Sequence, residues 1–281
     1  MATEILCAVE NMNETILTVA MHGIQGQQTR FINIVETIPE EHKLYVFKEG
    51  VFWYITVNWH RFPNPDQVVE FFGHVLNHRS CPVDNMKDML ASGLNSCSCK
   101  SLLLYSAITP YEPPPFSLLG FDLFSNMEIS IQPPTAYILQ LPEYPDVTDD
   151  NEDNPQPLTK LDLHKNFNAF AARFCGERII DEDGFFVLNM VIALEHSDKW
   201  PRHEYASLVL VVTEWLNLYH NIIRDRIMLN ETTRRSYTCG PLYAACVGGN
   251  REAPLDMARW NWWYNRFIEL GGSADSMEKF G

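Results

Sequence analysis

Hydrophobic and polar residues follow two different periods along this chain of 281 residues. A period of about 3.6 residues predicts an amphipathic helix, whereas strict alternation predicts a strand with one buried face. The helical period occurs in residues 14–22, 65–76, 83–90, 165–174, 214–229 and 254–270. Alternation, or a run rich in β-branched and aromatic residues, occurs in residues 31–38, 44–59, 101–108, 136–141, 177–194, 205–212 and 236–247. Helix and strand patterns are therefore interleaved along most of the chain.

Turn residues divide two of the strand segments into hairpins. Residues 48–50 interrupt the first of them, and Asp183-Gly184 interrupts the second. A glycine after an aspartate supplies the positive φ that a tight hairpin turn requires. The whole pattern predicts an α+β fold, in which a single compact domain has a mainly antiparallel, sandwich-like β core and flanking helices.

Three regions are expected to lie outside this core, within one domain covering residues 1–281. Residues 1–28 and 250–281 are predicted to form protruding N- and C-terminal helical arms. Residues 143–157 contain six acidic residues and no basic residue, which is typical of a solvated loop. A domain boundary at this proline-rich loop is the alternative, and we disfavour it because strand patterns continue beyond it.

The charge balance limits the classes of partner. The chain has 21 basic and 36 acidic residues, a formal net charge of −15. Nucleic acids and anionic membranes bind basic surfaces, so neither is an expected partner. No signal sequence opens the chain, and no apolar run approaches the roughly 20 residues of a membrane span. These features predict a soluble intracellular protein whose seven cysteines are reduced thiols.

Sequence motifs of the common catalytic and nucleotide-binding sites are absent, including GxxxxGK[ST], GxGxxG, HExxH and GxSxG. His74 and His78 are one helical turn apart, but no third metal ligand is identifiable, which favours two exposed histidines. Cys97 and Cys99 lack the two-residue spacer of zinc and redox pairs, which favours free thiols. The sequence therefore predicts no metal site.

Two further groups of reactive side chains are weak candidates. Asp181, Glu182 and Asp183 offer three carboxylates to a cation, but their spacing is not that of a calcium loop and a hairpin turn explains the same residues. Cys175 with His164 or His203 forms a conceivable nucleophile and base, although a chain with seven cysteines and nine histidines offers such pairs by chance. We expect no catalytic residue. The alternative function is an enzyme or small-ligand-binding domain with a pocket lined by His, Cys and Trp.

Aromatic residues are concentrated near the C-terminal end of the chain. On a helix, Trp260, Trp263 and Phe267 share one face while Trp262 points elsewhere, which favours contacts with another subunit because Trp and Tyr anchor interfaces. A plain core helix is the equal alternative, and docking of a host protein on residues 260–270 is a third hypothesis. The candidate subunit-interface residues are Trp260, Trp262, Trp263, Tyr264, Phe267 and Tyr237.

The order of motifs in the second half of the chain resembles the polyhedrins of cypoviruses, which are insect reoviruses. The order is a strand, the Asp183-Gly184 turn, a strand at 185–194, His203-Glu204-Tyr205, an alternating segment, a long helix and Ser236-Tyr237. The hairpin at 44–59 followed by the helix at 65–76 is similar to that family's first half, more faintly. The chain departs from the family pattern in its acidity, its lower tyrosine content, its acidic loop and its C-terminal extension.

The resemblance implies a structural protein and not an enzyme. It implies a homotrimer that packs into intracellular crystals, the viral occlusion bodies of the host cytoplasm, which embed virus particles and dissolve at alkaline pH. This function requires no cofactor. The resemblance also implies nucleotide binding within the lattice, but it assigns no residue of this chain to a nucleotide contact. Deprotonation of Cys, Tyr and Lys at high pH would make the net charge more negative than −15. The resulting repulsion between subunits is compatible with release from the crystal at alkaline pH.

Overall fold

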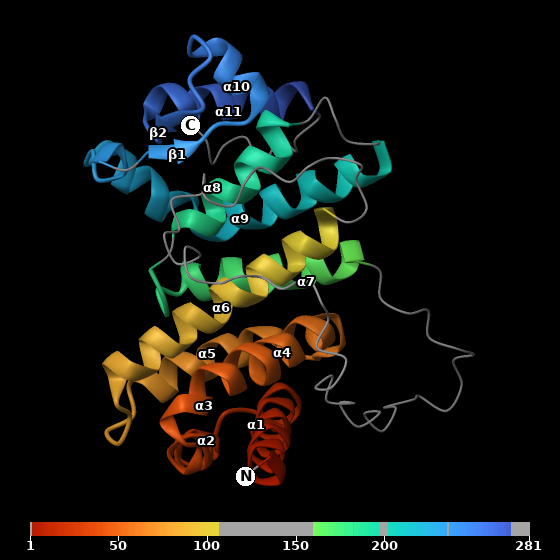
Figure 1. Cartoon of the computed structure of the whole chain (residues 1–281), viewed down its shortest axis with the longest axis vertical. Coiled ribbons are helices and arrows are strands. Elements are labelled where there is room, and N and C mark those ends of the chain that lie inside the picture. The colour runs from red at the N-terminus through yellow and green to blue at the C-terminus, as the bar shows by residue number, and fades with distance from the viewer. Residues whose placement is uncertain (1, 107–159, 182, 197–201, 235, 271–281) are drawn as a thin grey trace.

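The computed structural model describes residues 2–106, 160–181, 183–196, 202–234 and 236–270. Its helices are stacked along the longest axis of the molecule, as Figure 1 shows, and they follow chain order except that α9 lies between α7 and α8. The first end of the stack comprises α1 (Ala2–His22) and α2 (Gln27–Thr37). Next come α3 (Glu40–Tyr45), the π-helical η1 (Val46–Val51), α4 (Phe52–Asn58), the 3-10 turn η2 (Trp59–Arg61) and α5 (Pro65–Leu76).

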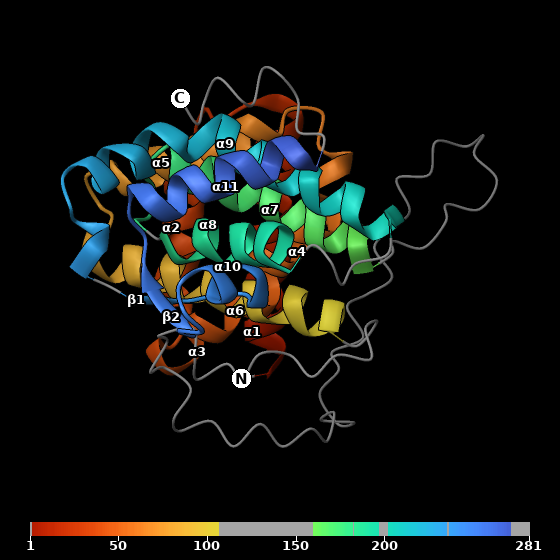
Figure 2. The same ribbon diagram turned by 90° about the horizontal axis from the view of Figure 1, so that it is seen from above.

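The stack continues through its middle to the second end. The central helices are α6 (Val83–Ser106) and α7 (Lys160–Gly176), followed by α8 (Asp183–Met190), the π-helical η5 (Val191–Glu195) and α9 (Arg202–Met228). The second end comprises η7 (Thr232–Arg234), β1 (Ser236–Thr238), α10 (Pro241–Cys246), β2 (Glu252–Pro254) and α11 (Met257–Glu269). Viewed from above in Figure 2, α11 runs alongside α9 at this end.

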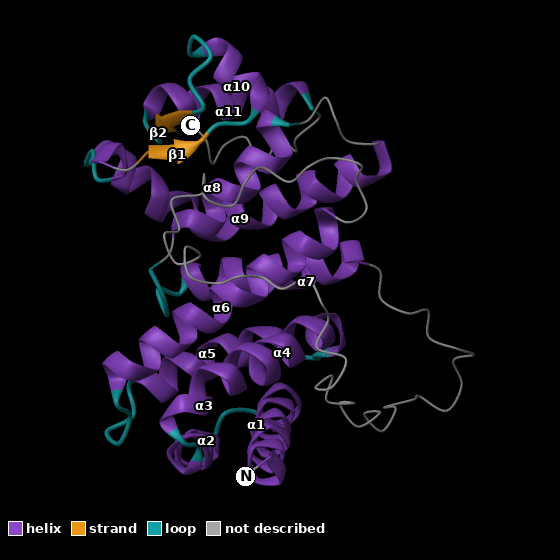
Figure 3. Cartoon of the chain, viewed as in Figure 1, coloured by secondary structure: helices purple, strands orange, loops and turns teal. Residues whose placement is uncertain are grey.

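The predicted β core is wrong, because the described part of the chain is almost entirely helical (Figure 3). Its two strands, β1 and β2, form a single antiparallel ribbon in which Tyr237 lies opposite Ala253. Residues 31–37, 52–58, 185–190 and 205–212 were all predicted as strand and are helical. Residues 101–106 end α6, and the predicted strand at 136–141 lies outside the described residues.

Burial on several sides explains why these helices resemble strands in sequence. In α8, Phe185, Phe186 and Val187 are all buried although they point in successive directions around the helix. A helix that is apolar all round loses the 3.6-residue period by which a sequence indicates it. The predicted hairpin turn is the first turn of this helix, where the carboxylate of Asp183 interacts favourably with the helix dipole.

Local signals identified other helices correctly. The helix predicted at 65–76 is confirmed as α5, with Pro65 at its first position. Helix α7 ends at Gly176 as predicted. The last helix begins at Met257 instead of Pro254, because Asp256 caps it by accepting a hydrogen bond from the backbone N–H of Arg259 at 2.9 Å.

The prediction of a protruding N-terminal arm is wrong for the residues that the structure describes. Helix α1 packs against α2 and α5, and the side chains of Met12 and Ile16 are completely buried. At the other end, β2 and α11 are also part of the packed body. The acidic segment 143–157 and residues 271–281 lie outside the described residues.

Phenylalanine rings connect the layers of the stack. The Phe52 ring of α4 lies 6.2 Å from Phe72 of α5, 5.7 Å from Phe170 and 6.0 Å from Phe174 of α7, measured between centroids. All four side chains are fully buried. Contacts of this kind add to the free energy of burial, so the first and second halves of the described chain share one core.

Gly93 of α6 allows the close approach of Phe52, and Gly93→Ala is expected to destabilise the fold by about 1–3 kcal/mol through overpacking. A Cβ at this position would lie 2.5 Å from Cδ2 of the Phe52 ring, which is itself fully buried. Urea unfolding of both proteins measures the difference. The control is Gly73→Ala in α5, where the added Cβ would meet Ile179 at an ordinary 3.8 Å. Equal stability of the two variants would contradict this prediction.

Candidate functional site

The histidine and cysteine pairs do not form metal sites in the structure. His74 is exposed and lies 3.3 Å from Glu70, while His78 makes a hydrogen bond with Thr29 at 3.3 Å. Cys97 and Cys99 lie within α6. No group of three His, Cys, Asp or Glu side chains among the described residues is arranged to hold a metal ion.

The carboxylates of Asp181 and Asp183 both pair with Arg226, in the last turn of α9. The Tyr237 hydroxyl also donates a hydrogen bond to Asp183, at 3.4 Å. These contacts tie the segment before α8 to the end of α9 and to β1. A guanidinium therefore occupies the place that a bound cation would need.

Cys175 and His164 do not converge. Both side chains are buried on α7, but they are separated by about three turns, or about 16 Å along the helix. Burial lowers the pKa of His164 to about 4. The Asn168 amide donates to the backbone carbonyl of His164 at 2.9 Å and accepts from the indole of Trp215 at 2.9 Å. His203 lies near the start of α9.

The candidate interface residues of α11 lie mainly inside the chain. Trp260, Trp263 and Phe267 are completely buried, while Trp262 is half-buried with its ring centroid 5.3 Å from that of Tyr243. Tyr264 is also half-buried, and so is Tyr237 of β1. Their role in subunit contacts stays a prediction.

A buried ion pair organises the second end of the stack, and sequence reasoning did not identify it. Glu195 ends η5, and its side chain and that of Arg259 in α11 are both completely buried. The guanidinium contacts both carboxylate oxygens, with Nε–Oε1 at 2.8 Å and Nη2–Oε2 at 3.1 Å. Glu195 also accepts from the indole of Trp263 at 2.8 Å and from the backbone N–H of Gly240 at 2.5 Å.

The remaining donors of Arg259 bind the β ribbon. They reach the carbonyl oxygens of Thr238 at 2.7 Å, Ala253 at 3.1 Å and Tyr237 at 3.3 Å. All five N–H groups of a guanidinium are thus used, and the pair joins η5, both strands and α11. Its complete burial and saturation make it a structural centre, since no polar atom of the pair is left to bind a ligand. The one feature of the sequence that could have indicated the pair is Glu195, an acidic residue directly after the mainly apolar run 185–194.

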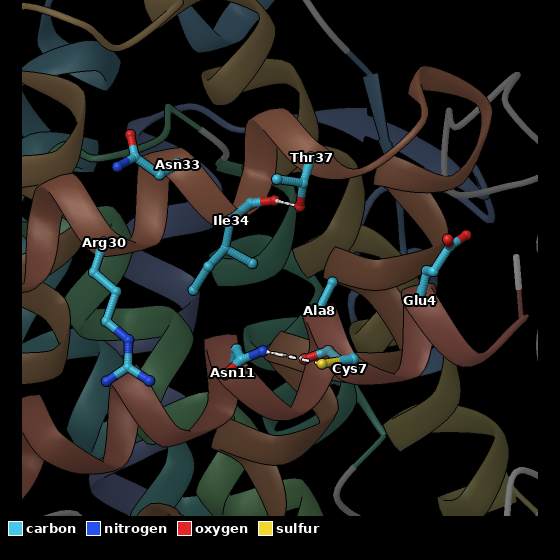
Figure 4. Close-up of a pocket in the computed structure, with 8 residues that line it drawn as sticks. All are labelled: Glu4, Cys7, Ala8, Asn11, Arg30, Asn33, Ile34 and Thr37. Carbon is cyan, nitrogen blue, oxygen red and sulfur yellow. Dashed lines mark hydrogen bonds between the residues drawn. The ribbon is translucent and has the colours of Figure 1, made fainter.

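The described surface has an open groove between α1 and α2, with a volume of about 480 Å³ (Figure 4). Ala8 and Ile34 supply apolar contacts from the two helices, and Asn11 and Asn33 supply amides. The Asn11 amide nitrogen donates to the carbonyl oxygen of Cys7 at 2.8 Å and lies 3.3 Å from its Sγ. The other lining residues are Glu4, Cys7, Arg30 and Thr37.

The two ends of the stack differ in charge. Residues 2–45 contain six acidic and two basic residues, a net charge of −4, and all six carboxylates are exposed. The described residues of the other end, 232–234 and 236–270, contain four arginines and three acidic residues, a net charge of +1. Arg259 is compensated internally by Glu195, so these residues are close to neutral. No helix among the described residues is long and apolar enough to cross a membrane.

A family model described as a protein of unknown function, DUF3632, matches residues 122–267. The matched segment covers 146 of the 281 residues. The chain belongs to the DUF3632 family. No curated protein and no solved structure shows a significant match to it. The DUF3632 segment contains the whole Glu195–Arg259 network, whereas the α1/α2 groove lies before it.

Proposed function

We propose that this DUF3632 protein is a non-catalytic structural protein that associates with copies of itself through the ends of its helix stack. The observation on which the proposal rests is the difference between the two ends. One end is acidic and has an open groove, and the described residues of the other end are close to neutral. In proteins built from stacked helices, each layer packs on the next, and terminal layers must be covered or polar.

The described polar clusters support a structural role. The charged groups of the Glu195–Arg259 pair and of Asp183 with Arg226 bind each other within the fold. Arg173 likewise pairs with Glu214 and with Asp66, which joins α7 to α9 and α5. These side chains hold helices together, and their geometry does not resemble that of a catalytic centre.

The narrower prediction of an occlusion-body protein stays a prediction. Its resemblance to polyhedrins used a strand-turn-strand order in the second half of the chain, and residues 185–194 of that order are helical. Self-association does not depend on that order, because it follows from the surfaces of the two ends. The proposal therefore includes neither a trimer, nor a crystal lattice, nor enclosed virus particles.

Analytical ultracentrifugation of the purified full-length chain tests the proposal. We expect the average mass to increase with protein concentration beyond that of a dimer. Added salt should strengthen the association, because it screens the repulsion between chains that each carry a net charge of −15. A chain that stays monomeric at every concentration in both low and high salt would contradict the proposed function.

A further inference from the structure

We infer that the fold binds one buried water molecule, which joins the hydroxyl of Tyr219 in α9 to the carboxylate of Asp183 in α8. The site lies inside a single chain, so it does not depend on self-association. Tyr219 is 1% exposed and Asp183 is 5% exposed. A buried water typically makes about three hydrogen bonds to polar groups that lack other partners, and the site is identified by the groups that hold it.

The Tyr219 hydroxyl is the first of these groups. The ring is held between α8 and α9, with its centroid 5.8 Å from that of Phe186 and 5.9 Å from that of Trp215. The hydroxyl oxygen is buried and has no hydrogen-bond partner among the described residues. Burying a hydroxyl without a partner is costly, and native proteins satisfy most such groups with protein atoms or ordered water. This hydroxyl therefore needs a partner that the described side chains do not supply.

The carboxylate of Asp183 is the second group. The Arg226 guanidinium donates to its Oδ1, whereas Oδ2 accepts from the Tyr237 hydroxyl at 3.4 Å. An ordinary O–H···O hydrogen bond is about 2.5–3.0 Å long, so the contact with Tyr237 is weak. An ionised carboxylate has about four acceptor positions. The Oδ2 atom can therefore accept a second and stronger hydrogen bond.

The packing of α8 against α9 brings the two groups to the same place. Phe186, which contacts Tyr219, follows Asp183 by three residues and lies on the same side of α8. Arg226, which binds Asp183, follows Tyr219 by seven residues and lies on the same side of α9. Burial raises the pKa of Tyr219 above its ordinary 10, and the negative charge of Asp183 raises it further. The field of this carboxylate therefore reaches the hydroxyl.

Water suits this pair of groups better than an ion does. The described residues contain no group of three His, Cys, Asp or Glu side chains that could hold a metal ion. An anion would be repelled by the carboxylates of Asp183 and Asp181, which both pair with Arg226. A water molecule can accept from the phenol and donate to the carboxylate. It therefore satisfies both groups without changing the charge, at little cost in entropy.

A high-resolution crystal structure of the full-length chain tests the site directly. We expect electron density for one water molecule at about 2.5–3.0 Å from both Oη of Tyr219 and Oδ2 of Asp183. Three observations would each overturn the inference. They are a direct hydrogen bond between the two side chains, a hydroxyl paired with another protein atom, and a hydroxyl with no neighbour within hydrogen-bond distance.

The variant Tyr219→Phe gives an independent measurement, because the direction of its effect depends on whether water is bound. It keeps the ring that contacts Phe186 and Trp215 and removes only the hydroxyl. Loss of a hydrogen-bonded water should increase the equilibrium constant of unfolding about five-fold. Removal of a hydroxyl that has no partner would instead leave this constant unchanged or lower it. Urea unfolding at neutral pH measures the constant.

The matched control is Tyr45→Phe, which makes the same exchange at a position that is 43% exposed. The increase for Tyr219→Phe is measured relative to this control. An unfolding constant of Tyr219→Phe that is equal to or below that of the control would overturn the inference. Neither measurement depends on the oligomeric state, so a monomeric chain would contradict the proposed function and leave the water site to be decided by these two results.

Discussion

Replacing Arg259 by methionine is expected to destabilise the protein by about 3–5 kcal/mol, because it leaves the completely buried carboxylate of Glu195 without its counter-charge. The substitution also removes the donors that bind the carbonyl oxygens of Thr238 and Ala253, and buried acceptors without partners add to the cost. Urea unfolding at neutral pH measures the change in the free energy of unfolding.

Two further variants separate the lost charge pair from a general effect of the substitution. Arg266→Met changes the same residue type on the same helix, but Arg266 pairs at 2.7 Å with Glu269, whose side chain is 61% exposed. An exposed pair contributes less than about 1 kcal/mol. The double variant Arg259→Met with Glu195→Gln removes the uncompensated charge and should recover part of the lost stability. Equal losses for Arg259→Met and Arg266→Met would contradict a central role for the buried pair.

Acidification is expected to weaken the fold through His164 by about 3 kcal/mol in total between neutral pH and pH 4. Burial lowers the pKa of this side chain from its ordinary 6.5 to about 4 in the folded protein. Between these two values the unfolded chain binds the proton and the folded chain does not. Stability therefore decreases as the pH falls from about 6.5 to about 4, and this contribution is constant below pH 4.

Comparison with His164→Gln isolates this contribution from that of the carboxylates. The variant should lose less stability than the natural chain over the same pH interval, as measured by urea unfolding at a series of pH values. His74→Gln, at an exposed position of α5, is the matched control for replacing a histidine by glutamine. Parallel pH profiles for the natural chain and His164→Gln would be incompatible with a buried neutral imidazole.

Several elements could be predicted from the sequence because their signals are local. Proline has a fixed φ and no backbone N–H, and both properties suit the first position of a helix. This signal placed the start of α5 at Pro65. The inward positions Trp260, Trp263 and Phe267 of α11 follow from their spacing, and the structure buries all three. What the spacing did not show is whether their buried surroundings belong to the same chain or to another subunit.

The secondary structure of the buried segments could not be predicted in this way. Residues 185–190 are apolar on nearly every side, and such a run is equally compatible with a buried strand. Their helical state depends on the neighbouring helices, since Phe186 packs against Trp215 of α9 and Trp260 of α11. The mistaken β core follows from this ambiguity, and so does the mistaken hairpin turn at Asp183-Gly184.

By itself, the sequence determined the acidic character of the protein, the absence of the common catalytic motifs, and those helices that have a distinct start, end or polar face. Only the tertiary structure decided that buried apolar runs are helices, that Glu195 pairs with Arg259 at a separation of 64 residues, and that α1 and α2 enclose a groove. The physical reason is the distance along the chain over which each interaction acts. Capping, proline and periodicity act within a few residues of each other, whereas an ion pair, a shared core and a groove exist only after distant segments have packed together.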